Sequence, residues 1–257
     1  MPISSSAATV EKKKVVRIQK QYQSIDQNEA QQTERNLLKI APALPTKDKR
    51  NLYVRSHSSL NALSVTKFHE SRSLSESVVL RTHPDGSVHV SRLQEEKEAH
   101  PDRISLDRRG LTCIPFIDGE PRLRLLSLQH NLVINLEALS KQTFLSLVFL
   151  DIYDNQLEHI QHLDTLENLR VLLMGKNRIK KIEGLENLKK MEVLDLHGNQ
   201  IAQVGGLSLL SELKVLNLAG NQIRIIGLQD LHGLHSLQEL NIRRNKLKKL
   251  LGFADTP

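Results

Sequence analysis

Six asparagines recur at nearly constant intervals in the second half of this 257-residue chain, and their spacing limits the fold more than any other feature. Successive members are 24, 22, 22, 22 and 24 residues apart. They are Asn131, Asn155, Asn177, Asn199, Asn221 and Asn245. A fixed interval of this length is typical of architectures that stack one structural unit on the next. The spacing therefore predicts a solenoid over this half of the chain.

The residues around each asparagine repeat one frame, L-x-x-L-x-L-x-x-N-x-φ-x-x-φ, in which φ is apolar. The third copy, LRVLLMGKNRIKKI, begins at Leu169, and the fourth, MEVLDLHGNQIAQV, begins at Met191. The x-L-x-L-x part predicts a short strand, because side chains alternate between the two faces of a strand. Leu172 and Met174 then point into the core, and successive strands lie parallel. The frame is identified as that of the leucine-rich repeat.

Each asparagine follows its strand, at the point where the chain must turn. A side-chain amide can both donate to and accept from neighbouring backbone, so we expect Asn155, Asn177, Asn199 and Asn221 to be buried. A 22-residue period leaves little room on the convex side, which favours short 3₁₀ or irregular segments over full α-helices. The predicted fold is an α/β solenoid, a leucine-rich repeat arc whose parallel strands form the concave sheet.

The frame also predicts how this half of the chain is organised. Residues 101–120 fit a half-repeat that caps the N-terminal end, with Arg109 where an asparagine is expected. Six repeats follow over 121–251, and residues 252–257 are a tail. The last repeat is followed by no polar closing segment, so its apolar flank is expected to be open. The expectation is a chain truncated from a longer protein; the alternative is a partner subunit that covers this flank.

The first hundred residues differ in composition from the repeats. They hold 16 basic and 11 acidic residues, a balance of +5, and are rich in Ser and Gln without a sustained apolar period. Such a segment buries too little apolar surface to offset its ordering entropy, so most of 1–100 is expected to be disordered. Two β-prone runs around Pro84-Asp85-Gly86 leave open a hairpin over 77–93, although an isolated hairpin is marginal in water.

Several classes of chemistry find no support in the sequence. There is no phosphate-binding glycine loop and no G-x-S-x-G elbow, so the chain is not expected to be an enzyme or to need a cofactor. The pairs His159/His162 and His232/His235 lack a third ligand, so no metal site is expected. A net charge of +7 is modest, and no apolar run reaches the length of a membrane span. Neither nucleic acid nor membrane is an expected partner.

The remaining expectation is a protein-binding surface on the concave face, formed by the strand residues between the inward leucines. Phe149 and Tyr153 are two of only eight aromatic residues and are candidate anchors, although Phe149 could simply cover a neighbouring strand. Acidic residues are expected near the middle of this face and a basic residue at its end. The candidate residues are Gln129, Phe149, Asp151, Tyr153, Asp195, His197, Asn217, Asn241 and Arg243.

The 22-residue frame with N-x-I-x-x-I resembles the SDS22-type leucine-rich repeat, whose founding member regulates a protein phosphatase. The stretches DRISLDRRGLT, FLDIYDNQLEHI, LRVLLMGKNRIKKI and VLDLHGNQI are also similar to the non-catalytic leucine-rich repeat subunits of tubulin polyglutamylase assemblies. This resemblance implies a cytoplasmic scaffold at microtubules, centrosomes or cilia, with polyglutamylase subunits or tubulin as partners. The SDS22 resemblance implies the alternative, a regulatory module that binds a phosphatase catalytic subunit.

Overall fold

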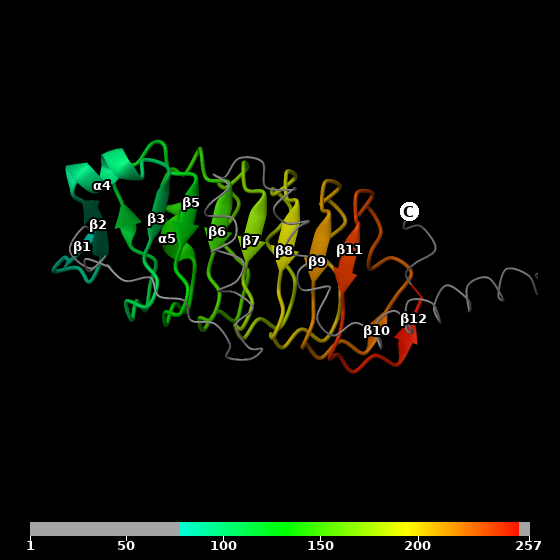
Figure 1. Ribbon diagram of the computed structural model, residues 1–257. Helices are drawn as coiled ribbons and strands as arrows, with labels where there is room; N and C mark the ends of the chain where they lie inside the picture. The colour runs from blue at the N-terminus through cyan, green and yellow to red at the C-terminus, as the bar shows by residue number, and fades with distance from the viewer. Residues whose placement is uncertain (1–77, 252–257) are drawn as a thin grey trace, which may run out of the picture. The chain divides into compact units, whose positions relative to one another are not determined.

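The computed structural model describes residues 78–251, which belong to one compact unit. Its main feature is a seven-stranded parallel sheet with the order β11-β9-β8-β7-β6-β5-β3, one strand for each copy of the frame and one for the cap (Figure 1). The strands are β3 (Arg103–Ser105), β5 (Leu125–Ser127), β6 (Phe149–Asp151), β7 (Val171–Leu173), β8 (Val193–Asp195), β9 (Val215–Asn217) and β11 (Glu239–Asn241). The predicted solenoid is confirmed.

The register of the sheet places equivalent residues of successive repeats side by side. Leu150 pairs with Leu172, and Leu172 pairs with Leu194. All three are fully buried in one continuous apolar core. Phe149 and Val171 are also paired across strands, but they lie outside that core because strand side chains alternate between faces. We call the face of the sheet that carries them the concave face.

The inner asparagines are buried, as the spacing predicts, with exposed fractions of 5–7%. The amide of Asn177 donates from Nδ2 to the carbonyl oxygens of Met174 in its own repeat (3.1 Å) and Ile152 in the preceding one (2.9 Å). Its Oδ1 accepts a hydrogen bond from the backbone N–H of Leu157 at 3.0 Å. One side chain thus joins two turns, and the bonds repeat along the stack.

The convex side is built mainly from turns rather than helices, as expected. Backbone N–H groups there bond carbonyls three residues earlier, for example Leu166 to Leu163 (3.0 Å) and Leu169 to Leu166 (2.9 Å). The one helix among the described repeats, α5 (Glu137–Ser140), occupies the first 24-residue interval. In the last turns, β10 (Ile225–Ile226) and β12 (Lys249–Leu250) form a short parallel pair, apart from the main sheet in Figure 1.

A hairpin precedes the repeats, at the place where the sequence analysis allowed one. β1 (Val78–Thr82) pairs antiparallel with β2 (Val88–Arg92), and β2 pairs parallel with β4 (Phe116–Ile117) of the cap. A short helix, α4 (Gln94–Ala99), leads from the hairpin to β3. Because Val78 and Val90 belong to the common core, the folded unit reaches back to residue 78, before the boundary placed at 101.

A buried ion pair connects the hairpin to the cap. Arg92 donates from Nε and Nη2 to the two carboxylate oxygens of Glu120, at 2.9 and 2.6 Å. Its Nη1 donates to the carbonyl oxygens of His100 (2.8 Å) and Arg103 (2.9 Å). The Arg92 side chain is only 1% exposed, so its charge is matched by hydrogen bonds inside the protein.

The expectation of disorder for most of 1–100 falls largely on residues 1–77, which lie outside the described residues, as does the 252–257 tail. No helix among residues 78–251 is long and apolar enough to cross a bilayer.

Candidate functional site

The strands bring the predicted binding residues onto one face of the sheet. Asp195 of β8 is in register with Asn217 of β9, which is in register with Asn241 of β11. Phe149 and Asp151 lie on β6, and Tyr153 is the second residue after that strand. Gln129, His197 and Arg243 occupy the same position after their own strands as Tyr153. The candidate residues therefore share one face of the sheet, although β7 (Val171–Leu173), between β6 and β8, contributes none of them.

The sequence predicts that these side chains face solvent, and in most of the row this is wrong. Tyr153 is 3% exposed, Phe149 6% and Asp151 0%, whereas Arg243 is exposed. One reason is the register, which sets each of these positions between equivalent side chains of neighbouring strands. Parallel strands lie only about 4.8 Å apart, so a large side chain covers its neighbours. Alternation gives the face to which a side chain points, but not how far neighbours cover it.

Asp151 is the most enclosed polar group on the concave face. Its Oδ1 accepts a hydrogen bond from the backbone N–H of Tyr153 at 3.0 Å, and its Oδ2 accepts one from Nε2 of Gln129 at 2.5 Å. Burial raises the pKa of Asp151 to about 8; the two hydrogen bonds oppose the rise, and the charges of Asp107 and Asp195 add to it. Near neutral pH this carboxyl is largely protonated, so the expected acidic centre loses much of its charge.

Asp195 and His197 form a second polar contact on this face. The backbone N–H of His197 donates to Oδ1 of Asp195 at 2.9 Å, and Nδ1 of His197 lies 2.7 Å from the same oxygen. Burial lowers the pKa of His197 and so does the charge of Lys176, but the hydrogen bond to Asp195 and its charge raise it by more. The net shift of the His197 pKa is upward from 6.5, because Asp195 stabilises the protonated ring.

Tyr153 lies at the centre of a cluster of rings and positive charge whose members come from four successive repeats. Its ring centroid lies 5.5 Å from that of His130, in an edge-to-face arrangement, and 5.6 Å from that of His197. Nζ of Lys176 lies 5.3 Å from the centroid of the Tyr153 ring, within cation–π range. The cluster joins the aromatic and titratable parts of the row.

The absence of a side chain at Gly175 leaves room for the rings of this cluster. A Cβ atom at position 175 would lie 2.4 Å from Cε1 of His197 and 3.1 Å from Cδ2 of Tyr153. Any larger residue would therefore push the His197 ring away.

The sequence analysis did not identify His130, Lys176 or the role of Gly175 as part of this face. A signal exists, since His130 and Lys176 directly precede the frame asparagine and adopt left-handed backbone conformations, with φ of 56° and 51°.

Among residues 78–251, no three His, Cys, Asp or Glu side chains are arranged to hold a metal ion. His159, His162, His232 and His235 all lie exposed on the convex side. The chemistry that the described face offers is that of recognition, with aromatic, amide and charged groups held in a fixed register.

Comparison with known proteins agrees with the frame. Residues 167–209 match the family described as "Leucine Rich repeats (2 copies)", and residues 204–247 match "Leucine rich repeat". The stack is built from leucine-rich repeats. Leucine-rich repeat folds of this kind are typical of protein-interaction scaffolds, so the family favours a binding surface over a catalytic centre.

The chain is also similar to two curated proteins. Leucine-rich repeat-containing protein 49 of Homo sapiens is 51% identical over 77 residues, which are 30% of this chain and 11% of that protein. The Mus musculus protein of the same name is 51% identical over 51 residues, which are 20% of this chain and 7% of that protein. The matches thus span only a small part of the length of these relatives.

Two solved leucine-rich repeat structures resemble the chain at lower identity. They are the internalins inlF and inlC2 of Listeria monocytogenes, each 23% identical, with TM-scores of 0.45 and 0.48. The alignment with inlF covers 58% of this chain and 47% of the internalin. The alignment with inlC2 covers 60% and 76%.

Proposed function

We propose that this protein is a non-catalytic scaffold that binds a protein partner through the concave face of its leucine-rich repeats. The 51% identity over 77 residues to leucine-rich repeat-containing protein 49 carries this proposal. The polar and aromatic side chains that share this face support it, since the register of the sheet holds them in a fixed geometry.

The partner we propose is a tubulin-modifying assembly, either its polyglutamylase subunits or tubulin. The resemblance of the repeats to the leucine-rich repeat subunits of polyglutamylase assemblies supports this choice. In such an assembly the ligase chemistry belongs to another chain, and this chain positions it. The protein would then be cytoplasmic and would be found at microtubules, centrosomes or cilia.

Affinity capture of the full chain from ciliated cells, followed by quantitative mass spectrometry, tests this proposal. We expect the catalytic polyglutamylase subunit to be enriched over a tag-only control, together with tubulin. Imaging of the tagged chain should show it on microtubule structures.

The same capture separates the proposal from its main alternative. Enrichment of a phosphatase catalytic subunit without polyglutamylase subunits would replace the tubulin-modifying role with the SDS22-type regulatory one. Enrichment of neither class would contradict both roles.

A further inference from the structure

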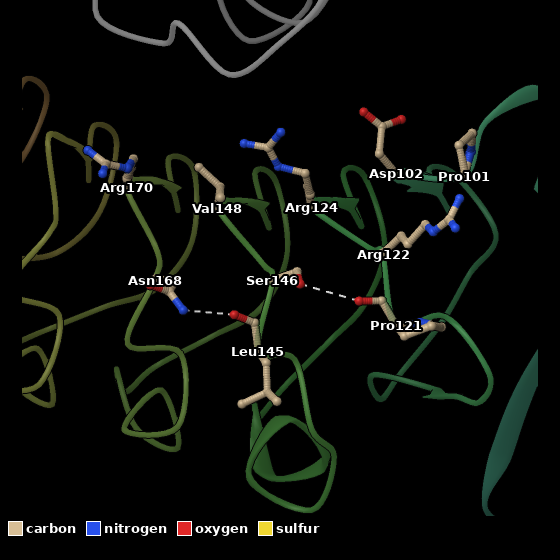
Figure 2. Close-up of a pocket in the computed structure, with 10 residues that line it drawn as sticks. All are labelled: Pro101, Asp102, Pro121, Arg122, Arg124, Leu145, Ser146, Val148, Asn168 and Arg170. Carbon is tan, nitrogen blue, oxygen red and sulfur yellow. Dashed lines mark hydrogen bonds between the residues drawn. The ribbon is translucent and has the colours of Figure 1, made fainter.

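A pocket of about 630 Å³ lies at the edge of the sheet, where the chain enters the strands. It spans successive repeats and is separate from the row of candidate residues on the concave face. Figure 2 shows its lining, in which Val148 lies between Arg124 and Arg170, Arg122 lies near Pro101 and Asp102, and the Leu145 side chain points away from the arginines. Val148 is half-buried, so part of an apolar side chain is open to solvent beside the positive charges.

The repeat itself sets the spacing of two of these arginines. The residue before each strand bonds its backbone N–H to the equivalent carbonyl of the preceding repeat. Val148 bonds to Arg124 and Arg170 bonds to Val148, both at 2.9 Å. Arg124 and Arg170 therefore lie two strand spacings apart, on the order of 10 Å. Because these backbone amides are already bonded, recognition at this edge depends on side chains.

The arginines differ in whether an acidic partner balances them. Arg170 donates to Glu192, whose other carboxylate oxygen lies 2.7 Å from Nζ of Lys214. The guanidinium groups of Arg122 and Arg124 make no ion pair and no hydrogen bond within residues 78–251. The one acidic lining residue, Asp102, lies 3.3 Å from Nε of Arg103, which it partly balances. Two positive charges are left for a ligand.

We infer that this edge pocket binds an extended acidic peptide, rich in glutamate, whose carboxylates pair with Arg122 and Arg124. Guanidinium groups form paired hydrogen bonds with carboxylates, which makes arginine the fitting residue for this ligand. The methylene groups of a glutamate side chain can lie on Val148 beside Arg124. Consecutive glutamates would supply a carboxylate to each arginine in more than one register.

Two features favour an acidic peptide over a phosphate group or RNA. The lining arginines do not converge on one point, because Arg122 and Arg124 precede β5 whereas Arg170 precedes β7, two strands away. None of the lining residues is aromatic, so the pocket offers no platform on which bases could stack. A second surface at this edge would act alongside the concave face and does not depend on it.

Fluorescence anisotropy with the full chain and a labelled glutamate-rich peptide tests the inference. We expect saturable binding that weakens with salt, and no binding of the same peptide with glutamine in place of glutamate. The double variant Arg122→Gln/Arg124→Gln should bind roughly fivefold more weakly or worse, because each change removes a charge-assisted pair. Arg122→Glu, at an exposed position, gives a second reading if the double variant unfolds.

The matched control is Arg178→Gln/Arg224→Gln, which removes two exposed charges after the strands, away from the pocket. This control should bind within about twofold of the unmodified chain, since it changes only net charge. Equal losses in both double variants would overturn the inference, because net charge alone would explain them. Tighter binding of a phosphopeptide or an RNA of equal charge, or no binding of the glutamate peptide, would also overturn it.

Discussion

Oδ1 of Asn199 accepts a hydrogen bond from the backbone N–H of Ile179 at 2.9 Å, across one full repeat of the solenoid. The same amide donates from Nδ2 to the carbonyl oxygens of Met174 and Leu196, each at 3.0 Å. A side chain that is 6% exposed thus satisfies three backbone groups that water cannot reach. This contact shows why the spacing of the asparagines determines the spacing of the turns.

Replacing this amide should lower stability by an amount that depends on its place in the stack. We expect Asn199→Ala to reduce the free energy of unfolding by about 1–3 kcal/mol, because the bonded backbone groups stay buried without partners. Asn245 makes the same kinds of bond but is only half-buried, so Asn245→Ala should cost less. Urea unfolding of both variants measures the difference. Equal losses would argue against burial as the cause.

The buried carboxyl of Asp151 should make stability depend on pH. The unfolded chain releases this proton near pH 3.8, whereas the folded protein holds it up to about pH 8. Between these values the free energy of unfolding falls as pH rises, at a limit of about 1.4 kcal/mol per pH unit from this group. Asp151→Asn cannot titrate, so its stability relative to the unmodified chain should rise with pH over this window.

Chemical unfolding of both proteins near pH 5 and pH 8 checks this shift. We expect the difference in the free energy of unfolding to change in favour of Asp151→Asn by on the order of 1 kcal/mol or more. Gln129 and the Tyr153 amide can still bond an asparagine side chain, which limits any constant cost of the change. A difference that stays constant with pH would show that Asp151 titrates normally.

The close approach of His197 to Gly175 predicts a second local effect. Gly175→Ala should lower the free energy of unfolding by about 1–3 kcal/mol, because its Cβ would displace the His197 ring. The displaced ring should lose its bond to Asp195, and the pKa of His197 should then move down. Thermal melting and an NMR titration of the ring measure both. Gly205→Ala is the control, since nothing lies within 4 Å of its Cβ position and little change is expected.

The ion pair between Arg92 and Glu120 predicts that the hairpin is part of the folding unit. We expect Arg92→Ala to reduce the free energy of unfolding by about 3–5 kcal/mol, because it leaves Glu120 buried without its main partner. Lys141→Ala, which breaks an exposed pair with Glu137, should cost less than about 1 kcal/mol. If both variants melt alike, the hairpin contributes little to the stability of the repeats.

The sequence was sufficient to predict the parts of the fold that repeat. Strands such as Val171–Leu173 and Val193–Asp195 lie where the frame places them, because alternation and a fixed period are properties of the local pattern. The pairing of His89 with Phe116 in the capping sheet was not predicted. It joins residues that no repeat relates, and only the three-dimensional structure brings them together.

The candidate site likewise has a part that the sequence predicts and a part that it does not. The sequence predicts which residues share the concave face, but not that Tyr153 is covered or that Asp151 is protonated. Both depend on atoms from neighbouring repeats, such as those of Gln129 and His197. The arginines of the edge pocket were missed for a related reason, since they occupy a frame position that tolerates any residue.

Binding of the purified partner to the full chain and to two single variants tests the central claim, protein binding through the concave face, most directly. We predict that Arg243→Ala, which removes an exposed side chain of this face, weakens binding by about 1–2 kcal/mol or more, as the loss of an interface arginine does. Thermal melting of the variant separates this effect from a loss of folding. Lys181→Ala, which removes one positive charge on the exposed convex side, should leave the affinity unchanged. Weaker binding of Lys181→Ala with unchanged binding of Arg243→Ala would contradict the claim.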